Sequence, residues 1–163
     1  SRGERVTRTN VPDGTGCYVG GGVSETLYET EFARIAVNSA VRLLAEQGGP
    51  ALTTLTAPEK NFTFLDAGVF VLDERGVSII DPAFKRYKSR DMTQYRDASD
   101  RFPFRLLLDK LADSPVALAP LYAAMPQSMN LRKKIIYARK TRMGDTPVIV
   151  GMAMNAPENI WQR

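Results

Sequence analysis

Tyr137 and Arg139 are the residues whose types and spacing best suit the binding of a small anion. They stand two positions apart in residues 131–142, a run whose β-branched and aromatic content predicts a strand. Because side chains alternate between the faces of a strand, placing Ile135 in the core carries Tyr137 and Arg139 inward with it. A buried guanidinium is costly unless an anion pairs with it, and a carboxylate fits it in bidentate geometry. The pattern therefore indicates a bound carboxylate, an internal partner such as Asp66, or an arginine at the strand end in solvent.

Further candidate ligand contacts lie on a neighbouring predicted strand and in one long irregular segment. Tyr122, on the strand predicted over residues 116–125, is placed to close the same cavity, and a plain core or edge tyrosine is the alternative. Residues 83–102 show no clean period, and so long a connection inside a compact domain is usually functional or disordered. Its aromatic side chains argue against disorder. In this region and at the start of the next helix we expect either ligand contacts or solvated side chains at Tyr87, Arg90, Tyr95 and Arg105.

The composition excludes several kinds of chemistry. The 163 residues contain no histidine and one cysteine, so the chain has no imidazole base, no His-ligated metal and no internal disulfide. No motif places a nucleophile beside a base, so we expect a protein that is not an enzyme and needs no metal or cofactor. The net charge of +4 is spread along the chain, and its densest cluster, residues 132–134, lacks the interleaved aromatics of a nucleic-acid-binding sheet. We therefore expect no nucleic-acid partner.

The secondary-structure elements that position these residues are predicted from the spacing of apolar residues and from the residues that begin or end a helix or strand. An amphipathic helix is predicted over residues 24–46, with Ser24 as its N-cap and Gly48-Gly49-Pro50 as its stop. The remaining predicted elements are a short helix over 50–55, strands over 67–73 and 77–80 joined by a turn with Gly76, a helix over 103–113, and strands over 116–125, 131–142 and 147–154. Sequential hairpins imply an antiparallel sheet of five strands with helices packed on it, an α+β, PAS-like or profilin-like architecture.

The two ends of the chain share a pattern. Arg5-Val6-Thr7-Arg8 and a turn before an apolar strand match Arg139-Lys140-Thr141-Arg142 and the strand that follows it. The match is short, and chance is the alternative. We therefore predict that residues 1–23 are the end hairpin of a preceding similar module or an N-terminal extension, that residues 24–155 form the main domain, and that 156–163 form a tail.

The hairpin residues resemble a known family. Residues 64–73, Phe-Leu-Asp-Ala-Gly-Val-Phe-Val-Leu-Asp, followed by Gly76 to Pro82, resemble the first hairpin of Cache sensor domains, where Y-V-F-V-x-D-x-x-G-x-x-x-x-H/D-P is frequent. Residues 131–142 and 147–151 resemble the fourth and fifth strands. The resemblance implies a PAS-like Cache domain with a pocket covered by residues 81–102. It also implies an extracytoplasmic or periplasmic bacterial module for signal transduction, as in chemotaxis, that binds a small carboxylate such as pyruvate, acetate or propionate.

An alternative of another class is a structural or protein-interaction domain of the same fold with no small-molecule ligand. The long helix over residues 24–46 would then be a face for a homodimer or for signalling. No run of 18 apolar residues occurs, so the chain is expected to contain no membrane span.

Overall fold

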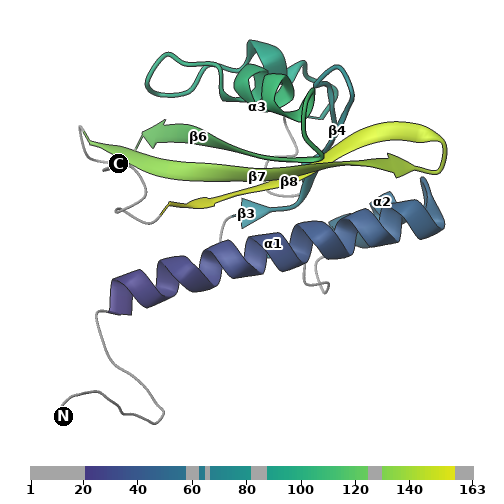
Figure 1. Ribbon diagram of the computed structural model, residues 1–163, viewed down its shortest axis with the longest axis horizontal. Helices are drawn as coiled ribbons and strands as arrows, with labels where there is room; N and C mark the ends of the chain where they lie inside the picture. Colours follow the sequence, from purple (N-terminus) through teal and green to yellow (C-terminus); the bar gives the residue numbers. More distant parts are fainter. Residues whose placement is uncertain (1–20, 58–62, 65–66, 82–87, 125–129, 157–163) are drawn as a thin grey trace, which may run out of the picture.

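A long helix, α1 (Gly21–Gln47), lies along one face of the sheet in the computed structural model, which describes residues 21–57, 63–64, 67–81, 88–124 and 130–156 (Figure 1). The helix begins at Gly21, so the predicted start and N-cap at Ser24 are wrong, and residues 21–23 are helical where the end of a hairpin was predicted. Glycine adopts helical angles at a modest cost, so Gly21 and Gly22 are compatible with the first turn of a helix. The rest of that predicted hairpin lies outside the described residues, and the division into modules stays a prediction.

The end of α1 follows the sequence closely. Gly48 takes a φ of +67° and donates its N–H to the carbonyl of Leu44 at 2.9 Å, which closes the last turn. The predicted short helix is confirmed as α2 (Ala51–Thr56), whose buried side chains, Ala51 and Leu55, join the core beneath α1.

Five antiparallel strands form the main sheet, as predicted. They are β4 (Phe70–Asp73), β5 (Ser78–Ile80), β6 (Val116–Ala124), β7 (Leu131–Met143) and β8 (Thr146–Asn155), in the spatial order β5-β4-β8-β7-β6. The predicted strand over 67–73 is interrupted at Val69, because β3 (Ala67–Gly68) pairs instead with β2 (Thr63–Phe64) in a separate small sheet. Strands β5 and β6 are therefore the two edges of the main sheet.

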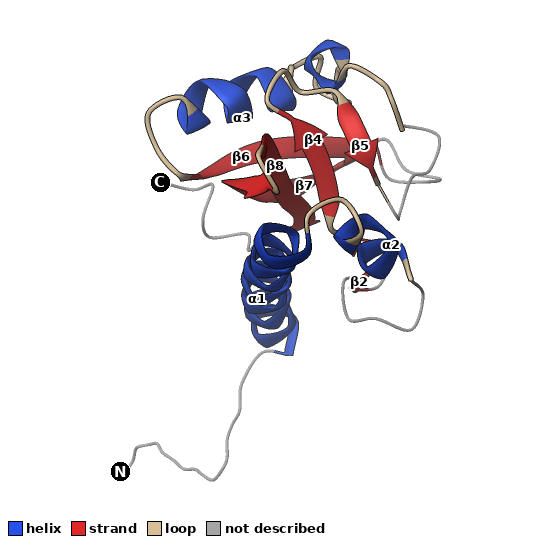
Figure 2. Ribbon diagram, turned by 90° about the vertical axis from the view of Figure 1, so that its right-hand side faces the viewer, coloured by secondary structure: helices blue, strands red, loops and turns tan. Residues whose placement is uncertain are grey.

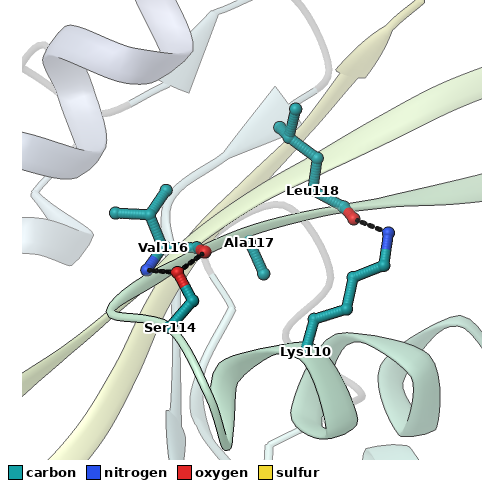
Figure 3. Close-up of a pocket in the computed structure, with 5 residues that line it drawn as sticks. All are labelled: Lys110, Ser114, Val116, Ala117 and Leu118. Atoms are coloured by element: carbon teal, nitrogen blue, oxygen red, sulfur yellow. Dashed lines mark hydrogen bonds between the residues drawn. The ribbon is translucent and has the colours of Figure 1, made fainter.

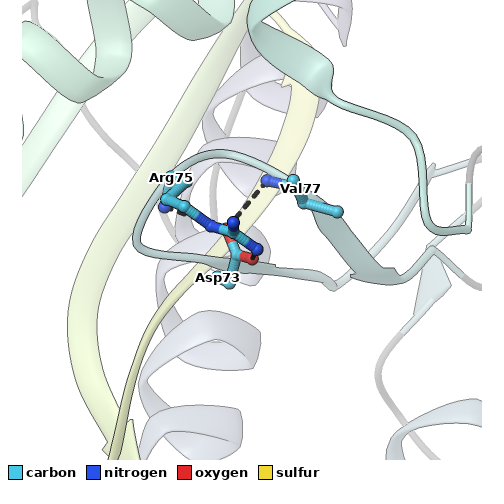
Figure 4. Close-up of polar contacts among 3 residues, drawn as sticks. All are labelled: Asp73, Arg75 and Val77. Atoms are coloured by element: carbon cyan, nitrogen blue, oxygen red, sulfur yellow. Dashed lines mark hydrogen bonds and ion pairs between the residues drawn. The ribbon is translucent and has the colours of Figure 1, made fainter.

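The turn between β4 and β5 is held by one carboxylate (Figure 4). Asp73 accepts hydrogen bonds from the backbone N–H groups of Arg75 and Val77, both at 2.9 Å, and from the Arg75 guanidinium at 3.1 Å. Gly76 has a φ of +96°, and a Cβ there would lie 2.8 Å from a side-chain atom of Thr93. Glycine thus satisfies both the turn and the close approach of the segment that crosses over it.

Both faces of the sheet are covered, which gives two apolar layers (Figure 2). On one face, α1 and α2 bury the α1-side core, which includes Ala36, Val37, Leu44, Val71, Tyr137, Val150 and Met152. On the other face, α3 (Pro103–Leu111) buries the α3-side core, which includes Phe70, Leu72, Met92, Phe104, Leu107, Ile136 and Ile149. Pro103 occupies the first turn of α3, as predicted.

Candidate ligand-binding site

The segment between β5 and α3, residues 88–102, is bonded to the outer edge of both edge strands, and we call it the cover segment. At β5, the N–H of Ser78 donates to the carbonyl of Arg90 at 2.8 Å, and the N–H of Ser89 donates to the carbonyl of Ser78 at 2.7 Å. The N–H of Met92 donates to the carbonyl of Gly76 at 2.9 Å, at the start of the short 3₁₀ helix η2 (Met92–Gln94). This end of the cover segment therefore continues the sheet.

The other end of the cover segment is fastened to β6 by Asp97. This side chain is 5% exposed, and its Oδ2 accepts the backbone N–H of Tyr122 at 3.0 Å. Its Oδ1 accepts the backbone N–H of Ser99 at 2.8 Å, the Ser99 hydroxyl at 2.7 Å and the N–H of Arg101 at 3.1 Å. The N–H of Ala98 adds a bond to the Tyr122 carbonyl at 2.9 Å.

These hydrogen bonds decide the charge state of Asp97. Burial alone raises the pKa of a carboxyl, but the bonds from the Ser99 hydroxyl and from the backbone of Tyr122, Arg101 and Ser99 outweigh it and lower the pKa of Asp97. The carboxylate is therefore ionised at neutral pH and acts as a structural anchor. The residue was missed in the sequence, although Asp followed two positions later by Ser is a common Asx-turn pattern.

The layer beneath the cover segment contains aromatic rings in contact with one another. The Tyr95 ring meets the Phe104 ring edge-on, with centroids 5.8 Å apart, and Phe104 meets Phe70 at 5.7 Å. Phe70 can approach β8 closely because its partner there is Gly151, where a Cβ would come 2.5 Å from the Phe70 ring. The layer between the cover segment and the sheet is thus predominantly apolar.

One polar atom in this layer has no partner. Ser78 is 3% exposed and pairs in register with Leu72, which places its side chain on the α3 side of the sheet. Within the described part of the chain, its hydroxyl makes no hydrogen bond. A buried hydroxyl left unsatisfied costs about 1–3 kcal/mol, so this serine points to a hydrogen-bond partner outside the described residues. No sequence signal distinguishes this serine from an ordinary strand residue.

Three of the predicted site residues share the α1 side of the sheet. Tyr137 is 8% exposed in the α1-side core, and Arg139 follows it on the same face, as the alternation predicts. The guanidinium of Arg139 donates to the side-chain oxygen of Asn38 on α1 at 2.8 Å. Tyr122 is assigned to the same face by its register opposite Lys133, but at the β6 edge its ring centre lies 5.9 Å from the guanidinium carbon of Arg101 in the cover segment.

Three others lie on the cover segment or at the start of α3. The carbonyl of Arg90 pairs with β5, its side chain is exposed, and Tyr95 is half-buried against Phe104. The guanidinium of Arg105 donates to the Thr93 carbonyl at 2.8 Å and lies 3.9 Å from the centre of the Phe102 ring, so it holds η2 in place. Tyr87 and Asp66 lie outside the described residues. The sheet therefore separates Tyr137 and Arg139 from the candidates on the cover segment and α3, and Tyr122 lies at the edge between these two groups.

An open hollow of about 470 Å³ runs along the outer edge of β6 (Figure 3). Lys110 on α3 donates to the carbonyl of Leu118 at 2.7 Å, and the Ser114 hydroxyl donates to the carbonyl of Val116 at 2.8 Å. Pro120 removes a further outward donor from this edge. These groups occupy or remove outward hydrogen-bonding positions of β6, which disfavours pairing with a further strand. None of the predicted ligand contacts lines the hollow.

Neither a metal-binding cluster nor a membrane-spanning helix is present in the described part of the chain. It contains no group of three or more His, Cys, Asp or Glu side chains arranged to hold a metal ion. None of its helices combines the length and apolarity needed to cross a bilayer.

Solved structures with the same fold were found, whereas no family model and no curated protein matches the chain. A periplasmic sensor domain of a chemotaxis protein superposes with a TM-score of 0.62 at 17% identity, over 79% of this chain and 95% of that one. A Cache chemosensory domain studied for carboxylic acid recognition gives 0.55 at 15%, over 83% and 93%. A methyl-accepting chemotaxis protein from Vibrio parahaemolyticus gives 0.54 at 13%, over 80% and 93%.

Proposed function

We propose that this chain, which has the α+β fold of Cache-type sensor domains, is an extracytoplasmic small-molecule sensor of a bacterial signalling or periplasmic protein. The fold likeness supports this proposal, since the similar structures are described as periplasmic, chemosensory or methyl-accepting chemotaxis proteins. A sensing role also fits the composition, which offers no histidine for catalysis.

The proposed ligand site is the layer between the sheet and the cover segment. The observation that carries it is the hydroxyl of Ser78, buried there without a partner among the described residues. The cover segment is attached at the two sheet edges, so a molecule beneath it would be enclosed by Tyr95 and Phe104. A mainly apolar chamber with few polar contacts is the usual form of a small-molecule site.

The proposed ligand is a small carboxylate such as pyruvate, acetate or propionate. The resemblance to Cache domains supports this class, and one similar structure concerns carboxylic acid recognition. The Ser78 hydroxyl would donate to a carboxylate oxygen, and Arg90, whose carbonyl already pairs with the Ser78 N–H, would supply the positive charge. The short chain of such an acid would lie against the aromatic rings.

Thermal unfolding of the purified chain with a panel of short carboxylic acids tests the proposal. A bound acid raises the melting temperature, because it stabilises only the folded state. Ser78→Ala removes the unsatisfied hydroxyl, so it should raise the melting temperature without ligand by a few degrees and weaken the ligand-induced shift. Ser39→Ala, at an exposed position on α1, is the matched control. It should change neither the melting temperature without ligand nor the shift that the ligand induces. No shift with any acid would refute the carboxylate, and an equal shift in both variants would refute the role of Ser78.

The second candidate function is an interaction domain without a ligand, acting through α1 as a homodimer. The observation that favours it is Ile35, which is 53% exposed on the outward face of that helix. Sedimentation over a range of concentrations tests it. Dimers that dissociate in Ile35→Glu but persist in Leu106→Glu, at a 39% exposed apolar position on α3 across the sheet, support this function, and a monomer at every concentration contradicts it.

A further inference from the structure

The domain has a defined polarity, because α1 and β7 run side by side in the same direction (Figure 1). They are connected at Asn38 and Arg139. From Asn38 back to Gly21 the helix extends about 25 Å at 1.5 Å per residue. From Arg139 back to Leu131 the strand extends about 26 Å at 3.3 Å per residue. Gly21 and Leu131 therefore lie at the same end of the domain.

The described chain also leaves the domain at this end. The N–H of Ala156, just after β8, donates to the carbonyl of Lys133 at 3.2 Å. At the opposite end, Gly48 after α1 lies beside Gly144 in the turn between β7 and β8. The two segments that connect the described domain to the rest of the chain thus meet it at one end, which we call the terminal end.

The terminal end carries a group of cations that the domain does not neutralise. Arg132 and Lys133 are exposed and Lys134 is half-buried, and alternation directs them to both faces of β7. No hydrogen bond or ion pair engages these three side chains in the part of the chain that the structure describes. Leu131, next to them, is 44% exposed although it is a large apolar residue.

We propose that the terminal end docks on an anionic lipid surface, with Arg132, Lys133 and Lys134 at the phosphate groups and Leu131 at the boundary of the acyl chains. Lys and Arg keep their charges at the headgroups while their stems and a neighbouring apolar side chain enter the interface. This combination of cations with an exposed leucine favours a lipid surface over a nucleic acid, for which aromatic stacking partners would be expected. The inference goes beyond the sensing role and does not depend on a ligand.

Tethering to vesicles provides the experiment, because three cations alone bind too weakly to be measured from solution. The full chain with a carboxyl-terminal hexahistidine tag is bound to vesicles of phosphatidylcholine with nickel-chelating lipid, with or without one third phosphatidylglycerol. In a Cys17→Ser background, a polarity-sensitive fluorophore is placed at Ala124→Cys, at the terminal end beside Leu131. A second sample carries it at Asp145→Cys, at the opposite end.

Docking predicts that the emission of the fluorophore at residue 124 shifts to the blue only on the vesicles that contain phosphatidylglycerol. The emission of the fluorophore at residue 145 should not shift on either kind of vesicle. Each cation near an anionic surface contributes roughly a fivefold gain, so R132Q/K133Q/K134Q should lower the docking constant on the order of a hundredfold. R42Q/K88Q/K140Q removes the same charge from exposed sites elsewhere and should retain docking. Equal shifts on both vesicles, equal losses in the two triple variants, or binding of a DNA duplex in place of vesicles would overturn the proposal.

Discussion

The carboxylate of Asp97 accepts the backbone N–H of Tyr122 at 3.0 Å across 25 positions of sequence. This contact fastens the cover segment to β6, together with the backbone bond from Ala98 to the Tyr122 carbonyl and the Arg101 guanidinium, which lies 5.9 Å from the centre of the Tyr122 ring. At β5, by contrast, backbone bonds from three residues hold the segment. The attachment to β6 therefore depends more on side-chain contacts than the attachment to β5 does.

Asp97→Asn should destabilise the domain by about 2–3 kcal/mol, because the amide cannot accept at both atoms and its N–H₂ would oppose the N–H of Tyr122. For a domain of this size the melting temperature would fall by roughly 5–10 °C. Urea unfolding followed by circular dichroism measures the loss. Asp109→Asn, at an exposed position on α3, is the matched control and should stay within about 0.5 kcal/mol. Equal stability of the two variants would show that Asp97 is not the anchor.

The stabilisation by Asp97 should disappear in acid. The pKa of Asp97 is lowered in the folded state by its hydrogen bonds, against the opposing effect of burial. A lowered folded-state pKa means that the contribution is complete above the unfolded value of about 3.9 and is lost as the pH falls through the folded value. The difference in unfolding free energy between the wild type and Asp97→Asn should thus be constant from pH 7 to about 5 and shrink below about pH 4. A difference that grows on acidification would contradict this assignment.

Arg139 provides a direct comparison between a ligand role and a structural role. Its contact with Asn38 joins α1 to β7, and a hydrogen bond to a charged group contributes about 1.5–3 kcal/mol. A double-mutant cycle of Arg139→Ala and Asn38→Ala should therefore give a coupling free energy of about 1–2 kcal/mol in urea unfolding. If the ligand lies beneath the cover segment, Arg139→Gln should leave the melting-temperature shift by a carboxylic acid unchanged. A variant of normal stability that no longer responds to the acid would place the ligand on the α1 side instead.

The order of the secondary-structure elements was predictable because each strand shows its own pattern of apolar residues, and turn or stop residues such as glycine separate the elements. The turn at Gly76 and the stop at Gly48 both coincide with a positive φ. Alternation also correctly put Tyr137 and Arg139 on one face of β7. Alternation does not reveal which layer covers that face, because residues 135–138 of β7 are buried on both sides of the sheet. The pairing of Arg139 with Asn38, 101 positions away, depends on tertiary packing alone.

The start of α1 and the anchor of the cover segment were missed for different reasons. The glycines before Ser24 suggested a strand and a turn, whereas residues 21–23 form the first turn of α1. Asp97 stands in a polar stretch without a period, where a carboxylate is usually solvated. Its role depends on Tyr122, which lies beyond α3 in the sequence.

Gly151 should be intolerant of a side chain because Phe70 fills the space over it. A Cβ at this position would come 2.5 Å from the Phe70 ring and 3.0 Å from the Tyr137 carbonyl. Gly151→Ala should therefore cost about 1–3 kcal/mol through displacement of the ring. Gly49→Ala has no atom within 4 Å of the new Cβ and is the matched control, with a change within about 0.5 kcal/mol.

Replacing the Phe70 ring with a smaller side chain tests whether the ring causes the destabilisation by Gly151→Ala. Phe70→Leu removes the atoms that collide, so Gly151→Ala should be less harmful in the Phe70→Leu background than in the wild type, with a coupling of about 1 kcal/mol or more in urea unfolding. The backbone contact with the Tyr137 carbonyl remains, so the recovery should be partial. Strictly additive losses would assign the cost to that backbone contact. They would also show that the Phe70 ring, and with it the aromatic floor beneath the cover segment, moves without a measurable cost.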